Sequence, residues 1–103
     1  MKLIVFYEEL AEYFMVCMET FAEKNNCEVL IVRKEVNAIA PFKFQDSTRV
    51  KIVNRNLFDL KALREIVSNF IPDAIFCAGW AYKPYLEICK QYHGKLPVIL
   101  GFD

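Results

Sequence analysis

The segment MKLIVFYEEL, residues 1–10, decides the fold class of this chain of 103 residues. Its apolar run at residues 2–6 is rich in β-branched and aromatic side chains, which is typical of a strand buried on both faces of a sheet. Glu8 and Glu9 then open a helical pattern that extends to about Asn25, because acidic side chains in a first turn favour the helix dipole. A buried strand followed by an amphipathic helix indicates a parallel α/β sheet.

The same alternation continues along the chain. Asp59 is predicted to cap a second helix that ends before Pro72, Pro84 to lie in the first turn of a third helix, and Gly94 to end it. Residues 33–47 have no clear period and are predicted to be a loop. The further strands are expected at residues 27–32, 48–54, 74–77 and 97–100.

Right-handed crossovers between these strands predict the order 3-2-1-4-5. The expected fold is therefore a single Rossmann-like domain over residues 1–103, with a five-stranded parallel sheet between two layers of helices. The strand order reverses between the first and fourth strands. A crevice opens at the carboxyl ends of the strands at such a point, and ligands of open α/β sheets bind there.

Composition and charge exclude several classes of function. Lysine plus arginine and aspartate plus glutamate both total 13, so no surplus of positive charge favours nucleic acid. No apolar run reaches the length of a membrane span, and the apolar start lacks the features of a signal peptide. We expect a cytoplasmic protein.

The four cysteines all fall inside apolar patterns, where cysteine acts as a small hydrophobic residue. None belongs to a C-x-x-C pair or has a histidine at metal-ligand spacing. Cys17, for example, belongs to the predicted buried stripe of the first helix, together with Phe14, Met18 and Phe21. The sequence therefore predicts core cysteines in a reducing compartment, with no disulfide and no metal site. The four are Cys17, Cys27, Cys77 and Cys89.

Three loops follow the first, fourth and fifth strands and meet at the predicted crevice. The first holds Glu8 and Glu9, whose carboxylates can bind sugar hydroxyls or accept a proton; the alternative is that both only stabilise the start of a helix. The third holds Asp103, a weak candidate for a catalytic base and otherwise a turn residue.

The second loop, residues 78–82, carries the single tryptophan of the chain. The indole of Trp80 can stack on a sugar or base, and Gly79 allows a ligand to approach the backbone closely. The alternative is that Trp80 shields the edge of the core. Tyr82 begins the next helix, whose free N–H groups can hold an anion or simply face solvent.

Motifs of several nucleotide-binding and catalytic α/β proteins are missing from the sequence. No G-x-G-x-x-G follows the first strand, so the dinucleotide fingerprint is absent, and there is no P-loop motif. No nucleophile elbow occurs either. The missing glycine-rich turn argues against a third alternative, a subunit of another Rossmann-like enzyme such as a nucleotide-sugar epimerase.

Several stretches resemble the N-terminal domain of GT-B fold glycosyltransferases of the retaining, family-4-like group. Family members similarly open directly on their first strand, have Pro-Asp before a short apolar strand, and have a later strand that begins with proline. The family commonly has glycines where this chain has Tyr7-Glu8-Glu9, and a histidine where it has Asp103. The stretches are MKLIVF (1–6), LKALREIV (60–67), FIPDAIF (70–76), Gly79-Trp80 and LPVILGFD (96–103).

The resemblance implies that this chain is part of the acceptor-binding domain of a larger enzyme. Such an enzyme transfers a sugar from a nucleotide-sugar donor to a glycan or a lipid-linked acceptor, and the donor is bound mainly by a second Rossmann-like domain with an E-x7-E-type motif. Nothing in the chain matches that domain, so we expect these residues alone to be inactive and to hold no cofactor or metal. The acceptor contacts implied are Tyr7, Glu8, Glu9, Gly79, Trp80 and Tyr82.

Two further points stay open at the level of sequence. Phe42, Lys43 and Phe44 in the irregular loop can touch a membrane or a lipid-linked acceptor, or can fold back on the core. The whole chain can also be a stand-alone binding or regulatory module of flavodoxin-like topology, without catalysis.

Overall fold

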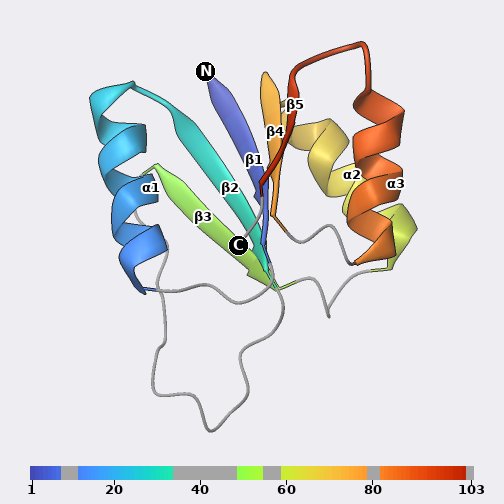
Figure 1. Cartoon of the computed structure of the whole chain (residues 1–103), viewed down its shortest axis with the longest axis horizontal. Helices are drawn as coiled ribbons and strands as arrows, with labels where there is room; N and C mark the ends of the chain where they lie inside the picture. The colour runs from blue at the N-terminus through green and yellow to red at the C-terminus, as the bar shows by residue number, and fades with distance from the viewer. Residues whose placement is uncertain (8–11, 34–48, 55–58, 79–81, 102–103) are drawn as a thin grey trace, which may run out of the picture.

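A parallel sheet lies at the centre of the computed structural model, which describes residues 1–7, 12–33, 49–54, 59–78 and 82–101 (Figure 1). Within these residues five strands pair in the order β3-β2-β1-β4-β5, and every pairing is parallel. The predicted Rossmann-like α/β arrangement is therefore confirmed. The strands are β1 (Lys2–Phe6), β2 (Glu28–Arg33), β3 (Val50–Asn54), β4 (Ala74–Cys77) and β5 (Val98–Leu100).

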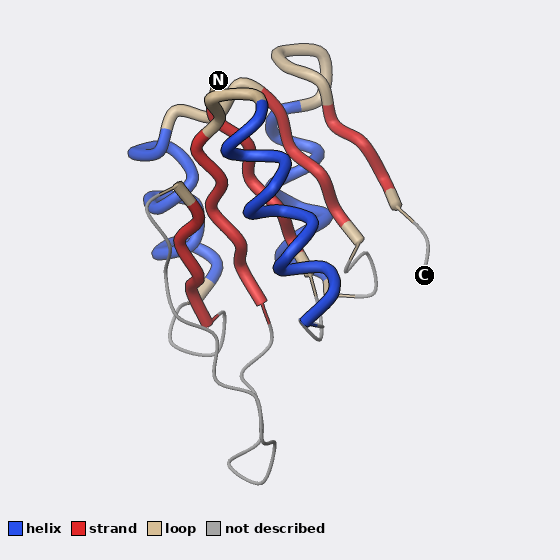
Figure 2. Tube along the Cα trace, turned by 90° about the vertical axis from the view of Figure 1, so that its left-hand side faces the viewer, coloured by secondary structure: helices blue, strands red, loops and turns tan. Residues whose placement is uncertain are grey.

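The helices form a layer on each side of the sheet. Helix α1 (Glu12–Lys24) lies on one face, while α2 (Leu60–Phe70) and α3 (Lys83–Tyr92) lie on the other (Figure 2). This division follows from right-handed crossovers, because the chain moves outward from β1 to β3 and then returns past β1 to β4 and β5.

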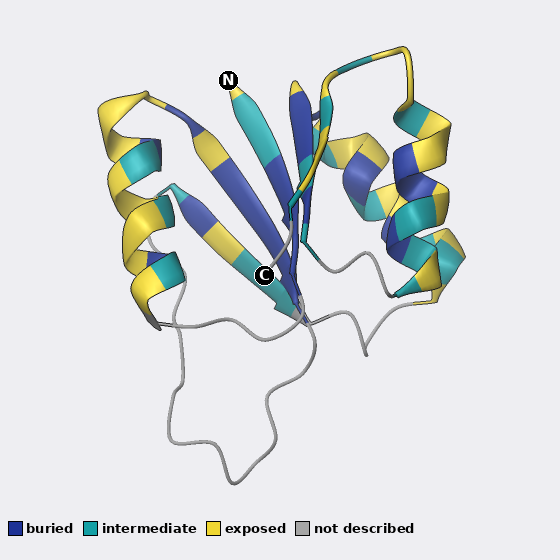
Figure 3. Cartoon of the chain, viewed as in Figure 1, coloured by how far each residue is buried: buried dark blue, intermediate teal, exposed yellow. Residues whose placement is uncertain are grey.

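Alternate residues of the strands face the two layers, so the core is divided in two. Buried residues gather along the central strands (Figure 3). On the side of α2 and α3, a cluster that includes Ile4, Phe6 and Ile75 packs against Leu63 and Val67. The cluster on the side of α1 includes, among others, Val5, Val29, Ile31, Val50 and Met15. We call these the α2/α3 cluster and the α1 cluster.

The two helix starts and the one helix end that were predicted at Asp59, Pro84 and Gly94 are confirmed. The Asp59 carboxylate accepts a hydrogen bond from the Ala62 N–H at 2.8 Å, so it caps α2. Pro84 lies in the first turn of α3, where its missing N–H costs no hydrogen bond. Gly94, just after that helix, has the left-handed backbone predicted for it, with φ +82°.

One expectation about burial was wrong. Cys17 is exposed and does not belong to the core, because it lies about 100° around the helix from the middle of the stripe formed by Phe14, Met15, Met18, Phe21 and Ala22. Ile99 and Leu100 of the edge strand β5 are 53% and 51% exposed. Ile99 pairs with Phe76, which packs on the α1 cluster, and Leu100 pairs with Cys77 of the α2/α3 cluster, so the two side chains lie on opposite faces of the sheet.

Candidate functional site

The carboxyl ends of β1, β4 and β5 meet at one edge of the sheet, as the sequence predicted. The Ala78 N–H donates to the Phe6 carbonyl at 2.8 Å, and the Gly101 N–H donates to the Cys77 carbonyl at 2.9 Å. These bonds extend the strand pairing by one residue at the point where each loop begins. The three predicted loops therefore leave the sheet from adjacent strands, which is the arrangement that a site at the switch point requires.

Most of the predicted contact residues lie outside the described part of the chain. This applies to Glu8, Glu9, Gly79, Trp80 and Asp103, and also to Phe42, Lys43 and Phe44 in the long loop. Their roles remain predictions. Tyr7 and Tyr82 are described, and they mark where the first two loops begin and end.

Tyr7 contributes to this edge through its backbone, because its side chain is buried. The ring is 6% exposed and stacks on Phe14 of α1, with the ring centroids 4.3 Å apart. The Tyr7 N–H donates to the Val32 carbonyl at 2.8 Å, which holds the end of β1 against β2. Tyr7 thus fixes the position from which the Glu8-Glu9 segment starts.

Tyr82 lies at the N-cap position of α3 and is half-buried. Its side chain makes no capping hydrogen bond to the helix. The ring meets the ring of Tyr85 edge-on, with centroids 4.8 Å apart and an interplanar angle of 80°. Tyr82 therefore packs against the core through Tyr85, at the position where α3 begins.

Tyr85 is the organising residue that the sequence analysis did not single out. It is fully buried, and its ring stacks on Phe6 at 4.6 Å. Its hydroxyl shares one proton between the carbonyl oxygens of Tyr7 at 3.1 Å and Val32 at 3.2 Å. One side chain of α3 thereby connects the ends of β1 and β2. In the sequence, the burial of Tyr85 is indicated by its position one residue after Pro84, on the same side of the helix as Ile88 and Cys89.

Arg33, the last residue of β2, is a second residue that was not singled out. It is 8% exposed, and burial lowers the pKa of its guanidinium below the ordinary value. A guanidinium in a poorly solvated place interacts strongly with carboxylate or phosphate groups. Its signal in the sequence was a charged residue that directly ends an apolar run, and its place in the fold is the carboxyl edge.

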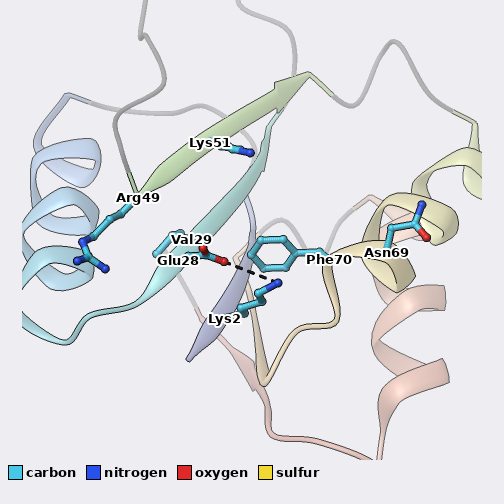
Figure 4. Close-up of a pocket in the computed structure, with 7 residues that line it drawn as sticks. All are labelled: Lys2, Glu28, Val29, Arg49, Lys51, Asn69 and Phe70. Carbon is cyan, nitrogen blue, oxygen red and sulfur yellow. Dashed lines mark ion pairs between the residues drawn. The ribbon is translucent and has the colours of Figure 1, made fainter.

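A shallow hollow lies at the opposite, amino-terminal edge of the sheet (Figure 4). Its volume of about 190 Å³ is below the range of roughly 300–1,000 Å³ usual for small-molecule sites. Lys2 pairs with Glu28 at 3.7 Å and lies over the Phe70 ring, while Arg49 extends toward α1 and donates to Asn26 at 2.6 Å. Lys2, Glu28 and Arg49 thus already interact with neighbouring side chains of the protein. The carboxyl edge therefore remains the candidate site.

The part of the chain that the structure describes holds no group of three or more histidine, cysteine, aspartate or glutamate side chains arranged for a metal ion. None of its helices is both long enough and apolar enough to cross a lipid bilayer.

The strand order and the edge just described define the class of this protein as a Rossmann-like α/β domain. No protein family and no curated protein sequence matches the chain. Among solved structures it is similar to the Bordetella bronchiseptica enzyme WbmH, which was crystallised in complex with NAD⁺. The identity is 12% and the TM-score 0.48, and the match covers 77% of this chain but only 26% of WbmH.

Proposed function

We propose that this chain is the acceptor-binding part of a GT-B fold glycosyltransferase, which transfers a sugar from a nucleotide-sugar donor to a glycan or a lipid-linked acceptor. The observation that carries the proposal is the convergence of the loops after β1, β4 and β5 at one edge of the sheet. The sequence stretches similar to the family-4-like group include the segments that start or end at this edge.

The chemistry of these loops suits a sugar ligand better than a dinucleotide. Sugar binding needs hydroxyl partners and a flat apolar surface, which Glu8, Glu9 and Trp80 can supply. Dinucleotide binding needs a glycine-rich turn for the pyrophosphate after the first strand, and this chain has Tyr7-Glu8-Glu9 there. On this proposal the donor and the groups that activate it belong to a second domain.

Binding to the isolated chain tests the proposal directly, because Trp80 is the only tryptophan and its fluorescence reports on that loop alone. We expect oligosaccharides, or a lipid-linked sugar in detergent micelles, to change the Trp80 emission saturably, with empty micelles as the blank. Nucleotide sugars should produce no saturable change. The reverse pattern would contradict an acceptor-side role.

Two matched variants place the response at the proposed site. Tyr82→Ala removes an aromatic ring at the end of the Trp80 loop and should weaken glycan binding several-fold. Ile71→Ala removes an apolar side chain that is 72% exposed and lies between α2 and β4 at the opposite, amino-terminal edge, so it should leave binding unchanged. In a glycosyltransferase that contains this chain, Trp80→Ala should raise the KM for the acceptor more than the KM for the donor.

A further inference from the structure

Strand β5 forms one edge of the sheet, and among the residues that the structure describes no strand lies beyond it (Figure 2). Ile99 and Leu100 are both more than half exposed, on opposite faces of this edge. A helix docked on either face would cover only one of these two side chains. A strand added beside β5 would flank both, so the edge fits an extended partner.

The backbone of β5 is open on its outer side. The carbonyl of Pro97 and the N–H of Gly101 both form hydrogen bonds of 2.9 Å with β4. Because successive residues of a strand direct their backbone groups to alternate sides, Ile99 also faces β4, while Val98 and Leu100 direct their N–H and C=O groups outward. The missing N–H of Pro97 lies on the inner side, so it leaves the outer side of the edge intact.

The two edges of the sheet differ in charge. Residues 96–101, which contain β5, carry no charged side chain. Strand β3 at the other edge has the exposed Lys51 and directly follows Arg49, and lysine on an edge strand is a common protection against pairing between molecules. A second β3 would bring like charges together, whereas a second β5 would meet no such repulsion.

We propose that β5 pairs with the β5 strand of a second copy of this chain, antiparallel and about a two-fold axis at Ile99. Val98 then lies opposite Leu100 of the second copy, and the two residues exchange both of their N–H···O bonds; symmetry repeats this pair on the other side of the axis. Ile99 lies opposite Ile99 of the second copy in a non-hydrogen-bonded pair, where the Cα atoms are about 4.5 Å apart and the side chains are in contact.

The symmetry of the strand is the reason to choose a second copy as the partner. The outward backbone groups and the apolar side chains are arranged equally on both sides of Ile99, so β5 complements itself. The strand has three residues, so the contact is smaller than the roughly 1,200–2,000 Å² of stable interfaces, and we expect a weak dimer with a Kd of about 100 μM. The proposal rests on this edge and not on the proposed function, so each can fail without the other.

Sedimentation equilibrium of the chain, from about 10 μM to about 1 mM, measures the association. A reductant keeps the exposed Cys17 from linking two molecules. We expect the mass to rise with concentration from that of the monomer toward that of the dimer. The outward N–H groups of Val98 and Leu100 should exchange more slowly with solvent as the dimer forms, while the N–H of Ile99, which faces β4, should change little.

Charge substitutions at the two-fold axis place the contact. Ile99→Lys and Ile99→Glu each bring like charges face to face, so each should weaken the dimer at least about tenfold. An equimolar mixture of the two variants should associate again, because Lys then faces Glu, and variants that had merely unfolded would not recover in this way. Val16→Lys is the matched control, because Val16 is 55% exposed on α1, and it should dimerise like the wild type.

A chain that stays monomeric at the highest concentration overturns the proposal, and the edge then belongs to a partner other than a second copy. Association that persists in Ile99→Lys places the contact on another surface, and assemblies larger than a dimer indicate pairing of β5 with β3; either result also overturns it. Should the Ile99 variants fail to fold, the exchange of the Val98 and Leu100 N–H groups in the wild-type chain alone decides.

Discussion

Removing the hydroxyl of Tyr85 tests whether one side chain of α3 stabilises the carboxyl edge of the sheet. Tyr85→Phe retains the ring, and with it the stacking on Phe6 and the edge contact with Tyr82. It removes the proton shared between the Tyr7 and Val32 carbonyls. The substitution therefore isolates a buried hydrogen bond from the packing around it.

The expected cost follows from the partners of the two carbonyl groups. The Val32 carbonyl keeps the N–H of Tyr7 at 2.8 Å, so its loss is small. The Tyr7 carbonyl loses the Tyr85 hydroxyl as a donor. Because the Tyr85 ring stays buried beside this carbonyl, water does not easily take the place of the hydroxyl. We expect the free energy of unfolding to fall by about 1–2 kcal/mol, which lowers the Tm by about 5–10 °C in a domain of this size.

Urea denaturation followed by circular dichroism measures this change, and an unchanged slope shows that the two folded states expose similar surface on unfolding. Tyr13→Phe is the matched control, because Tyr13 is 70% exposed and its variant should lie within about 0.5 kcal/mol of the wild type. If Tyr85→Phe is as stable as Tyr13→Phe, the hydroxyl does not stabilise this edge and our account of Tyr85 is refuted.

Three further predictions concern backbone approach, helix capping and pH. Gly101→Ala places a Cβ 2.5 Å from Cζ of Phe76, so it should destabilise the chain by about 1–3 kcal/mol in thermal melts, and Phe76→Leu should restore part of the loss. Asp59→Ala removes the cap on the Ala62 N–H and should cost about 1 kcal/mol by urea denaturation, whereas Asp59→Asn should be nearly neutral; equal losses would contradict the capping role. The pKa of the Cys89 thiol is raised in the folded state, so the folded protein keeps the neutral thiol where the unfolded chain begins to lose its proton. The free energy of unfolding should therefore be constant below the ordinary thiol pKa of 9.0 and should fall as the pH rises above it. Cys89→Ala should flatten that fall, and identical pH profiles of the variant and the wild type would show that Cys89 does not cause it.

The order of the strands could be predicted because the apolar runs are short, separate and unambiguous. Residues 2–6 and 74–77 have only strand-like patterns, and the helix signals at Asp59, Pro84 and Gly94 act through the local backbone alone. Such signals do not depend on the rest of the fold. Right-handed crossovers favour the order 3-2-1-4-5, which the structure shows.

The residues that organise the carboxyl edge were harder to identify. Tyr85 belongs to an apolar stripe, and only the tertiary structure shows that its hydroxyl reaches two carbonyls that are distant in sequence. Arg33 ends a strand like many charged residues, and its burial depends on neighbouring elements. Cys17 was assigned to the wrong side of its helix because it lies at the margin of the stripe.

The strand at the centre of the sheet is the first one in the chain, and this determines the order in which the molecule can assemble. Strand β1 pairs with β2 and with β4, and the Leu3–Ala74 pair joins residues far apart in sequence. A nascent chain can therefore pair β1, β2 and β3 early, with the other edge of β1 still without its neighbour. That edge is closed only when residues 74–77 are synthesised, and until then it is open to pairing with other chains.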